Sequence, residues 1–174
     1  MKKLFIILGV MSVMSTAAFA QTTGYVDTEV ILSKIPEYLQ AQQQLERLKS
    51  QYEVQMEREI KVIENLFSQY QAEKINLNEL QRQSRESDII SKERAVKERQ
   101  QEIFGQDGVM AANSKELLDP IREVVQSAIN SVAKESGTIL VFDIQSAQGI
   151  IFSDPKGDLT PRVLKKLGIN TETK

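Results

Sequence analysis

Residues 45–70 read LERLKSQYEVQMEREIKVIENLFSQY and carry apolar side chains at regular spacing. The apolar positions are Leu45, Leu48, Tyr52, Met56, Ile60, Ile63, Phe67 and Tyr70. Their separations average about 3.6 residues, which is the period of one face of an α-helix. Most of the remaining positions are Gln, Glu, Lys and Arg, which are good helix formers. The pattern predicts an exposed helix whose single apolar stripe packs against a partner helix.

A proline-free stretch from residue 37 to residue 119 extends this helix into a helical hairpin. Residues 76–78 read Asn-Leu-Asn between helix formers, and this is where we expect the chain to turn back. A sparser apolar row follows the turn, at Leu80, Ile89, Ile90, Val96 and Ile103. The second helix therefore offers fewer apolar partners than the first helix presents.

Gly105 and Gly108 predict a bend or interruption in the returning helix, because each costs about 1 kcal/mol relative to alanine in a helix interior. A helical pattern resumes at Val109. Pro120 predicts a kink or restart, since proline removes a backbone donor and clashes with the preceding turn. Gly137 is the expected residue just past the helix end.

Short β-strands are predicted on both sides of the hairpin. Residues 23–27 read as one strand, residues 138–143 (TILVFD) as a second and residues 149–153 (GIIFS) as a third. Residues 154–158 (DPKGD) form a turn, since Pro presets φ and Gly supplies freedom. Thr160 is the expected cap of a last short helix.

The predicted fold class is α+β, with a long antiparallel helical hairpin on a small β body. The hairpin, a coiled-coil arm, takes residues 37–119, and the β-rich body takes residues 21–36 and 120–174. Because the hairpin returns the chain to its start, the first strand can pair with the C-terminal strands. Three short strands are too few to stand alone, so we expect several copies to complete the body, which also removes exposed edges. The expected body contacts are Tyr25, Val26, Leu140, Phe142, Ile150 and Phe152.

Residues 1–20 have the order of a secretory signal peptide: a positive start, an apolar run, and Ala18-Phe19-Ala20 before Gln21. The apolar run is too short for a spanning helix. We therefore expect cleavage before Gln21 and export of the mature chain. Removal of Lys2 and Lys3 leaves 20 basic and 24 acidic residues, a net charge of −4.

The composition argues against an enzyme and against a nucleic-acid binder. The chain has no Cys and no His, so Ser-His and Cys-His pairs and the commonest zinc ligands are excluded. The acidic mature charge disfavours binding to phosphate backbones. Asp154 and Asp158 could hold a hard cation, but turn chemistry explains both. We expect no catalytic residue, no cofactor and no metal site.

The hairpin itself is the candidate binding site. Apolar residues near its turn exceed what the second helix can bury, and a mildly basic stretch lies between residues 82 and 99. The candidate arm residues are Phe67, Tyr70, Leu77, Leu80, Ile89, Ile90, Arg82 and Arg85. A plain alternative is that the stripe is coiled-coil packing and the charges are a solvated helix face. Exposed apolar residues on an arm would suit a low-specificity grip.

The ordered set of end motifs resembles the Skp/OmpH family of periplasmic chaperones. Its first part is GYVDTEVIL at residues 24–32. The C-terminal part is LDPI at 118–121, VAKE at 132–135, ILVFD at 139–143 and DLTPRVLKKL at 158–167. The resemblance covers essentially the whole mature chain, although residues between these motifs match mainly in composition. It implies a trimer with a β-barrel body and three helical tentacles that enclose a cavity.

The resemblance also implies an ATP-independent holding chaperone that binds unfolded outer-membrane proteins and prevents their aggregation in the periplasm. The best-known members are strongly basic, whereas this mature chain is acidic, so we expect at most weak contact with a membrane surface or lipopolysaccharide. The alternative function is an exported coiled-coil structural or adaptor protein of the cell envelope. The two hypotheses differ in whether the partner is an unfolded chain or a folded protein.

Overall fold

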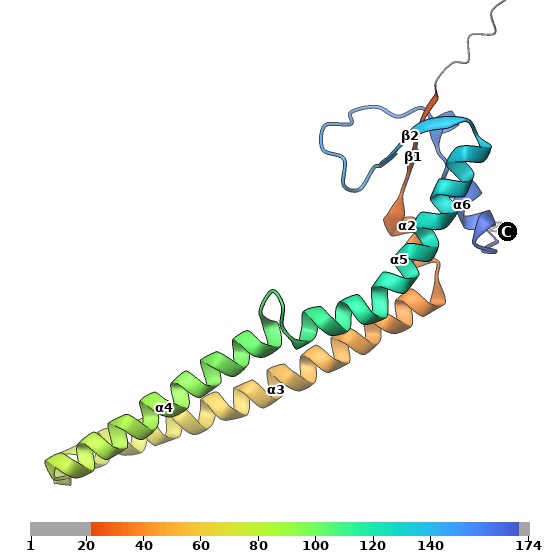
Figure 1. The fold of residues 1–174 in the computed structure, drawn as a ribbon. Coiled ribbons are helices and arrows are strands. Elements are labelled where there is room, and N and C mark those ends of the chain that lie inside the picture. Colours follow the sequence, from red (N-terminus) through yellow and green to blue (C-terminus); the bar gives the residue numbers. More distant parts are fainter. Residues whose placement is uncertain (1–21, 171–174) are drawn as a thin grey trace, which may run out of the picture.

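The computed structural model describes residues 22–170, which form a long helical arm attached to a small body (Figure 1). The predicted signal peptide lies outside the described residues. In chain order the elements are β1 (Thr22–Val26), α2 (Thr28–Ser33), α3 (Pro36–Glu73), the 3₁₀ turn η1 (Lys74–Asn76), α4 (Glu79–Phe104), α5 (Val109–Glu135), β2 (Thr138–Asp143), the 3₁₀ turn η2 (Pro155–Gly157) and α6 (Thr160–Lys166).

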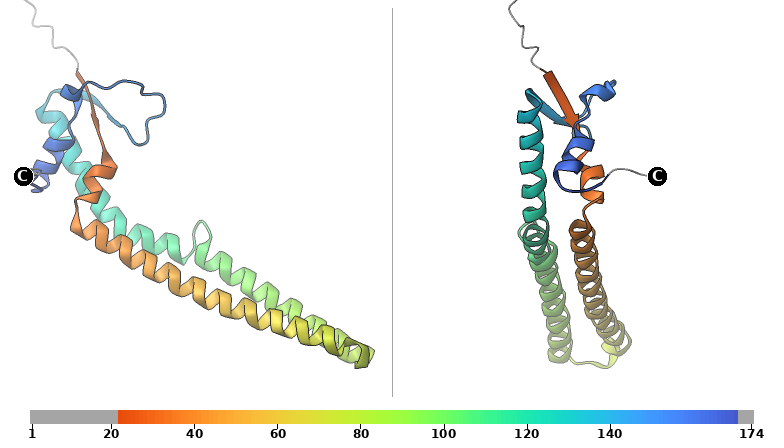
Figure 2. Two further views of the ribbon diagram at one scale, coloured as in Figure 1. Left: turned by 180° about the vertical axis from the view of Figure 1, so that it is seen from behind. Right: turned by 90° about the vertical axis from the view of Figure 1, so that its right-hand side faces the viewer.

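One limb of the arm is the uninterrupted helix α3. Pro36 stands at its start, where the missing backbone N–H would have no partner in any case. The helix has 38 residues, a length of roughly 57 Å at the usual rise per residue. The other limb is α4 followed by the first part of α5, and both views of Figure 2 show the limbs running side by side. The predicted antiparallel hairpin is confirmed.

The hairpin turns where the Asn-Leu-Asn sequence predicted. After η1, Leu77 is extended and Asn78 caps α4. The Asn78 side chain accepts a hydrogen bond from the Gln81 backbone N–H over 2.9 Å, and the Gln81 side chain accepts one from the Asn78 N–H over 3.0 Å. This reciprocal capping box starts the second helix in a defined direction.

The glycine interruption is also confirmed. Residues 105–108 form a short loop that projects from the arm between α4 and α5 (Figure 1). A Cβ on Gly105 would lie 2.3 Å from the Gln101 carbonyl oxygen, and one on Gly108 would lie 2.7 Å from that of Glu102. The chain can leave and re-enter the helix within four residues because neither position carries a side chain.

Helix α5 joins the arm to the body. It contains Pro120 without a break, so no restart occurs there, and its course bends between arm and body in Figure 1. The predicted body boundary at residue 120 therefore lies inside one helix. Gly137 follows the helix with a φ of 65°, a left-handed conformation that glycine adopts without strain.

The sheet has two parallel strands instead of the three strands we expected. Tyr25 pairs with Phe142 and Val26 with Asp143. Pairing of the first strand with residues 138–143 is therefore confirmed, whereas a strand at 149–153 is wrong for the single chain. A strand needs a neighbour for its backbone donors and acceptors, and β1 has β2 on one side and the Leu159 N–H, 2.9 Å from the Tyr25 carbonyl, on the other.

The core of the body comes from segments far apart in the sequence. Its buried residues are Val26, Ile31, Ile35, Val125, Ala128, Ile129, Val132, Leu159, Val163 and Leu164. They join β1 and α2 to the second half of α5 and to α6. Thr160 does not cap α6 as predicted; Leu159 stands at that position, and the Thr160 hydroxyl instead accepts a hydrogen bond from the Asp27 N–H over 2.9 Å.

The predicted α+β class is confirmed, with a long helical hairpin and one small sheet. Over residues 22–170, no helix is both long enough and apolar enough to span a membrane.

Candidate binding and assembly surfaces

The far half of the arm is held together by a small apolar core. Ile63, Tyr70 and Ile89 are buried between α3 and α4, and Leu66, Leu77 and Val96 pack around them partly buried. Our expectation that Tyr70 is incompletely buried is therefore wrong, and the candidate arm residue Ile89 is buried as well. Although the apolar row of α4 is sparse, the antiparallel register brings Ile89 against the stripe of α3, and each covers the other.

Tyr70 is also tied to α4 by a polar contact. Its hydroxyl donates a hydrogen bond to the Glu86 carboxylate, and the Lys74 ammonium lies 5.5 Å from the centre of its ring. The hydrogen bond to Glu86, with burial and the Glu86 charge, raises the pKa of the Tyr70 phenol above its usual value. Tyr70 therefore acts as a joint between the limbs near the turn.

Other candidate arm residues are exposed in the single chain. The relative exposure is 49% for Phe67, 77% for Leu80 and 54% for Ile90. Leu77 is half-buried. Sequence reasoning missed Val62 and Ile75, which are also exposed. Val62 lies outside the helical stripe, a signal that could have identified it as solvent-facing.

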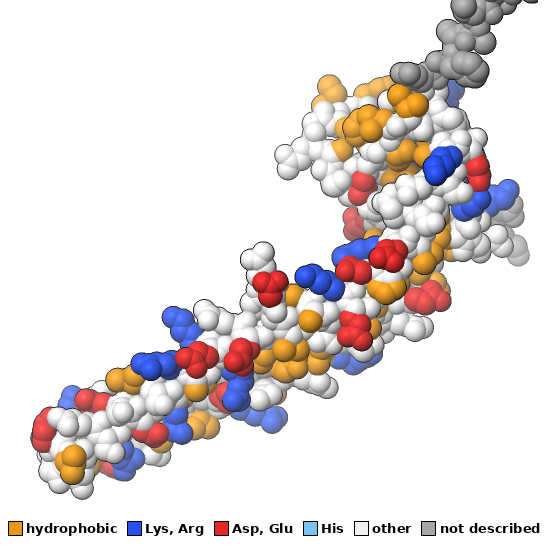
Figure 3. All heavy atoms as spheres, viewed as in Figure 1, with side chains coloured by type: hydrophobic (Ala, Val, Ile, Leu, Met, Phe, Trp, Pro, Cys, Tyr) orange, Lys and Arg blue, Asp and Glu red, His pale blue; other side chains and the backbone are white. Residues whose placement is uncertain are grey.

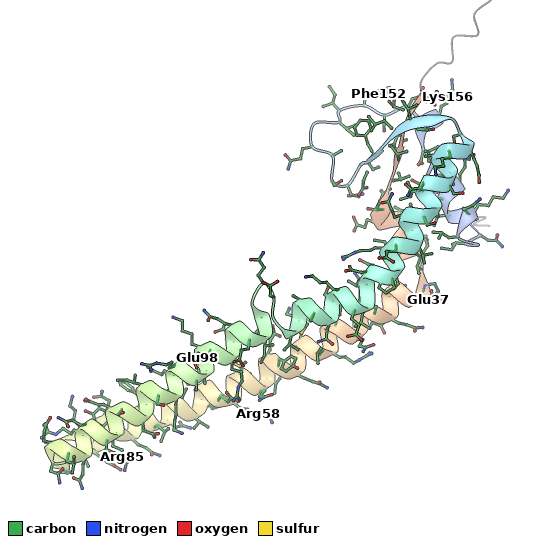
Figure 4. The ribbon with its side chains drawn as sticks, viewed as in Figure 1. Glu37, Arg58, Arg85, Glu98, Phe152 and Lys156 are labelled. Carbon is green, nitrogen blue, oxygen red and sulfur yellow. The ribbon has the colours of Figure 1, made fainter. Side chains whose placement is uncertain are left out.

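The two candidate arginines make contacts within the hairpin. The Arg82 Nε donates a hydrogen bond to the Leu77 carbonyl over 3.1 Å, and Arg82 lies 4.0 Å from the Glu79 carboxylate. Arg85, near the far end of the arm in Figure 4, lies 3.6 Å from the Glu73 carboxylate. Because these cations have acidic neighbours, their field at a distance is weakened.

Charges of both signs are interspersed along the face of the arm that Figure 3 shows. Arg99 on α4 contacts Glu59 on α3 at 2.5 Å, and Lys92 lies 3.8 Å from Asp88. The mildly basic composition of residues 82–99 therefore does not produce a purely basic face. A mixed, solvated helix surface describes it better, and such exposed pairs add little stability individually.

The body exposes a second apolar surface, which we call the apolar β surface. It consists of Leu140 and Phe142 of β2 with Ile150, Ile151 and Phe152, and Phe142, Ile150 and Phe152 line one hollow. Ile151 is 99% exposed and Phe152 is 81% exposed. Figure 3 shows hydrophobic side chains gathered on this end of the molecule, and Figure 4 places Phe152 there. Four of the six expected body contacts thus lie on this exposed surface.

The other two expected body contacts lie elsewhere. Val26 is buried inside the core of its own chain, and Tyr25 is half-buried. The alternation of side chains along β1 explains the difference, because Val26 points to the face that α2, α5 and α6 cover.

Sequence reasoning missed a polar joint at the edge of the body. The Asp27 side chain accepts a hydrogen bond from the Val30 N–H and caps α2, while its second oxygen accepts one from the Gln145 amide at 2.9 Å. The Asp143 carboxylate accepts hydrogen bonds from the Thr28 N–H and hydroxyl. These acids hold segments together instead of forming a reactive pair.

The aspartates of the 154–158 turn accept local backbone hydrogen bonds, as turn chemistry predicted. Asp154 accepts from the Lys156 N–H over 2.9 Å and Asp158 from the Thr160 N–H over 2.8 Å. Within residues 22–170, no group of three or more acidic, His or Cys side chains is placed to hold a metal ion.

A long helical hairpin stands on a small β body, and each of the two exposes large apolar side chains. The chain belongs to the OmpH-like family: the family model described as outer membrane protein (OmpH-like) matches residues 22–167. Membership of this family supports a general chaperone role.

A solved structure has a similar fold. It is an OmpH-like protein of Caulobacter crescentus CB15, described as a candidate outer membrane chaperone. The TM-score is 0.62 at 14% identity, with 87% of this chain and 88% of that chain covered. At this identity the likeness supports the fold alone. A search of curated proteins gave no match.

Proposed function

We propose that the protein is an ATP-independent holding chaperone of the periplasm that binds unfolded outer-membrane proteins between helical arms and prevents their aggregation. The observation that carries the proposal is the exposure of Phe67, Leu80 and Ile90 on an arm that projects from the body. Exposed apolar side chains on a projecting arm are available to cover apolar surface of a partner, which is favourable in water. An unfolded outer-membrane strand offers apolar side chains on alternate positions, which such a surface can cover.

The arm favours a weak, general grip over a specific one. Its apolar residues are spread over two helices, and they lie among charges of both signs, several of which form ion pairs. Spread-out apolar contacts accept many sequences, because no single pocket must be filled. The paired charges agree with at most weak attraction to lipopolysaccharide or a membrane surface.

An oligomer would complete the body and set several arms around one space. The apolar β surface supports this part of the proposal, since Leu140, Phe142 and Phe152 lie exposed beside a sheet of only two strands. A sheet that small needs cover to be stable. Three copies are the number that the family resemblance implies.

The test is suppression of aggregation. An outer-membrane β-barrel protein unfolded in urea is diluted into buffer with the mature chaperone, without ATP, and light scattering is followed. We expect suppression at a near-stoichiometric amount of oligomer. The variant Phe67→Ser/Leu80→Ser/Ile90→Ser should need several-fold more protein, whereas Val30→Ser, an exposed apolar position on α2 of the body, should behave as the parent.

Lack of suppression with several such clients would overturn the proposal. The adaptor alternative makes a different prediction, since it requires a discrete folded partner in crosslinking experiments and no affinity for unfolded chains.

A further inference from the structure

One side of the arm carries an open groove between its two limbs. The groove has a volume of about 470 Å³, and Ile60, Ile63 and Phe67 of α3 face Val96 of α4 across it. Its rim is formed by Glu64, Glu93, Lys97 and Gln100. On each helix the lining positions follow a spacing of three and four residues, which places them on one face. The floor is apolar because Ile63 and Val96 belong to the packed interior of the arm.

The opposite side of the same hairpin is different. Its groove is smaller, about 240 Å³, and the Arg99–Glu59 ion pair at 2.5 Å spans it from one helix to the other. No comparable pair bridges the larger groove among residues 22–170. The arm therefore has one bridged side and one side open to a ligand.

The rim of the open groove has an uncompensated acidic end. The Arg99–Glu59 and Tyr70–Glu86 contacts set the antiparallel register, which places Glu64 and Glu93 at nearly the same height on opposite walls. Within the described residues, neither carboxylate has a cation within ion-pair distance. Lys97 lies one turn further toward the body. A cation entering the groove between the two carboxylates would meet negative charge from both sides.

The length of the groove selects the shape of its occupant. From Ile60 to Phe67 the helix rises roughly 10 Å. An extended chain places side chains i and i+2 on one face at a separation of roughly 7 Å. An apolar side chain on the floor and a basic side chain two positions away therefore fit the groove together.

We propose that this groove binds an extended, unfolded segment that carries a large apolar side chain with Lys or Arg two residues away. The inference rests on the proposed holding function. It adds where on the arm an unfolded chain binds and which charge that chain carries. It reverses the preference expected of a basic arm, because the open side of this arm ends in two carboxylates.

The experiment uses the full mature oligomer and two fluorescein-labelled twelve-residue peptides, read by fluorescence anisotropy. Both peptides carry two phenylalanines; one has lysine two positions after each, and the other has glutamate there. We expect the lysine peptide to bind about three- to tenfold more tightly, with the preference fading in high salt, from the size of exposed ion pairs.

Variants separate the floor from the rim. Glu64→Gln/Glu93→Gln should remove the preference for lysine, and Glu93→Lys should reverse it, whereas Glu98→Gln, outside the groove, should keep it. Ile60→Ser/Phe67→Ser should weaken both peptides several-fold, and Val62→Ser on the bridged side should not. All of these side chains are exposed, so helicity by circular dichroism should match the parent.

Equal binding of the two peptides by the parent, or a lysine preference that survives Glu64→Gln/Glu93→Gln, would overturn this inference while leaving aggregation suppression intact. Absence of suppression together with the expected peptide preference would overturn the holding function instead. The two failures are therefore distinguishable.

Discussion

The hydroxyl of Thr28 donates a hydrogen bond to the carboxylate of Asp143 over 2.7 Å, although 115 positions separate them in the chain. The Thr28 backbone N–H donates to the other oxygen of the same carboxylate. The contact joins the start of α2 to the end of β2. It therefore joins two segments of the body that the whole hairpin separates in the sequence. Bringing such distant segments together costs chain entropy, which this contact helps to offset.

Thr28→Val keeps the shape of the side chain and removes the hydroxyl donor. We expect the free energy of unfolding to fall by about 1–2 kcal/mol, because a part-buried carboxylate oxygen loses its partner. Urea denaturation followed by circular dichroism measures it. Thr23→Val on the exposed part of β1 is the matched control and should change little. Equal effects of the two substitutions would show that the hydroxyl of Thr28 is not stabilising.

Gly105→Ala should destabilise the arm by about 1–3 kcal/mol, the usual cost of forcing an extra carbon into a packed site. The added Cβ would lie 2.3 Å from the Gln101 carbonyl oxygen, which belongs to the helix and cannot rotate away. Gly157→Ala is the control, since its Cβ would lie 3.6 Å from the Tyr25 ring. Thermal unfolding compares them, and a stable Gly105→Ala protein would contradict the close approach.

The arm should lose stability at alkaline pH, because Tyr70 then loses the proton that it donates to Glu86. Its folded pKa is raised above the unfolded value by the hydrogen bond to Glu86. The native state therefore holds the phenol proton more tightly, and this contribution is complete below about pH 10 and lost as pH rises through the folded pKa. Hydrogen exchange of α3 and α4 should increase over that range in the parent and less in Tyr70→Phe. An identical alkaline response in the two proteins would exclude Tyr70 as the cause.

Phe142→Asp should lower the mass measured by light scattering toward that of one chain. Phe142 is exposed on the apolar β surface, and a carboxylate buried between copies would lack a partner. Val54→Asp, an exposed apolar position on the arm, should leave the mass unchanged. A parent protein that is monomeric at micromolar concentration would contradict assembly through this surface.

The sequence predicted the arm well because its signals are local. The 3.6-residue period of residues 45–70, the asparagines before Glu79 and the glycines at 105 and 108 each act within a few residues of the chain. The hairpin, its turn and its interruption all lie where these signals placed them. A capping box or a glycine contact needs no distant partner.

Burial could not be predicted as well. The sparse second apolar row predicts incomplete burial of Tyr70, yet the register of α3 and α4 brings it against Ile89. Residues 149–153 have the composition of a strand, but no neighbouring strand is available to them in the single chain. Both errors concern which distant segment a residue meets.

Local sequence signals alone predict a long helical hairpin with a turn at residues 76–78, a break at Gly105–Gly108 and strands at residues 23–27 and 138–143. Helix period, capping and glycine geometry depend on neighbours in the chain. The three-dimensional packing was needed to show that Val26 is buried in its own core, that Thr28 contacts Asp143, and that an ion pair bridges one side of the arm while the other side is open. These outcomes depend on register and packing between segments far apart in the sequence.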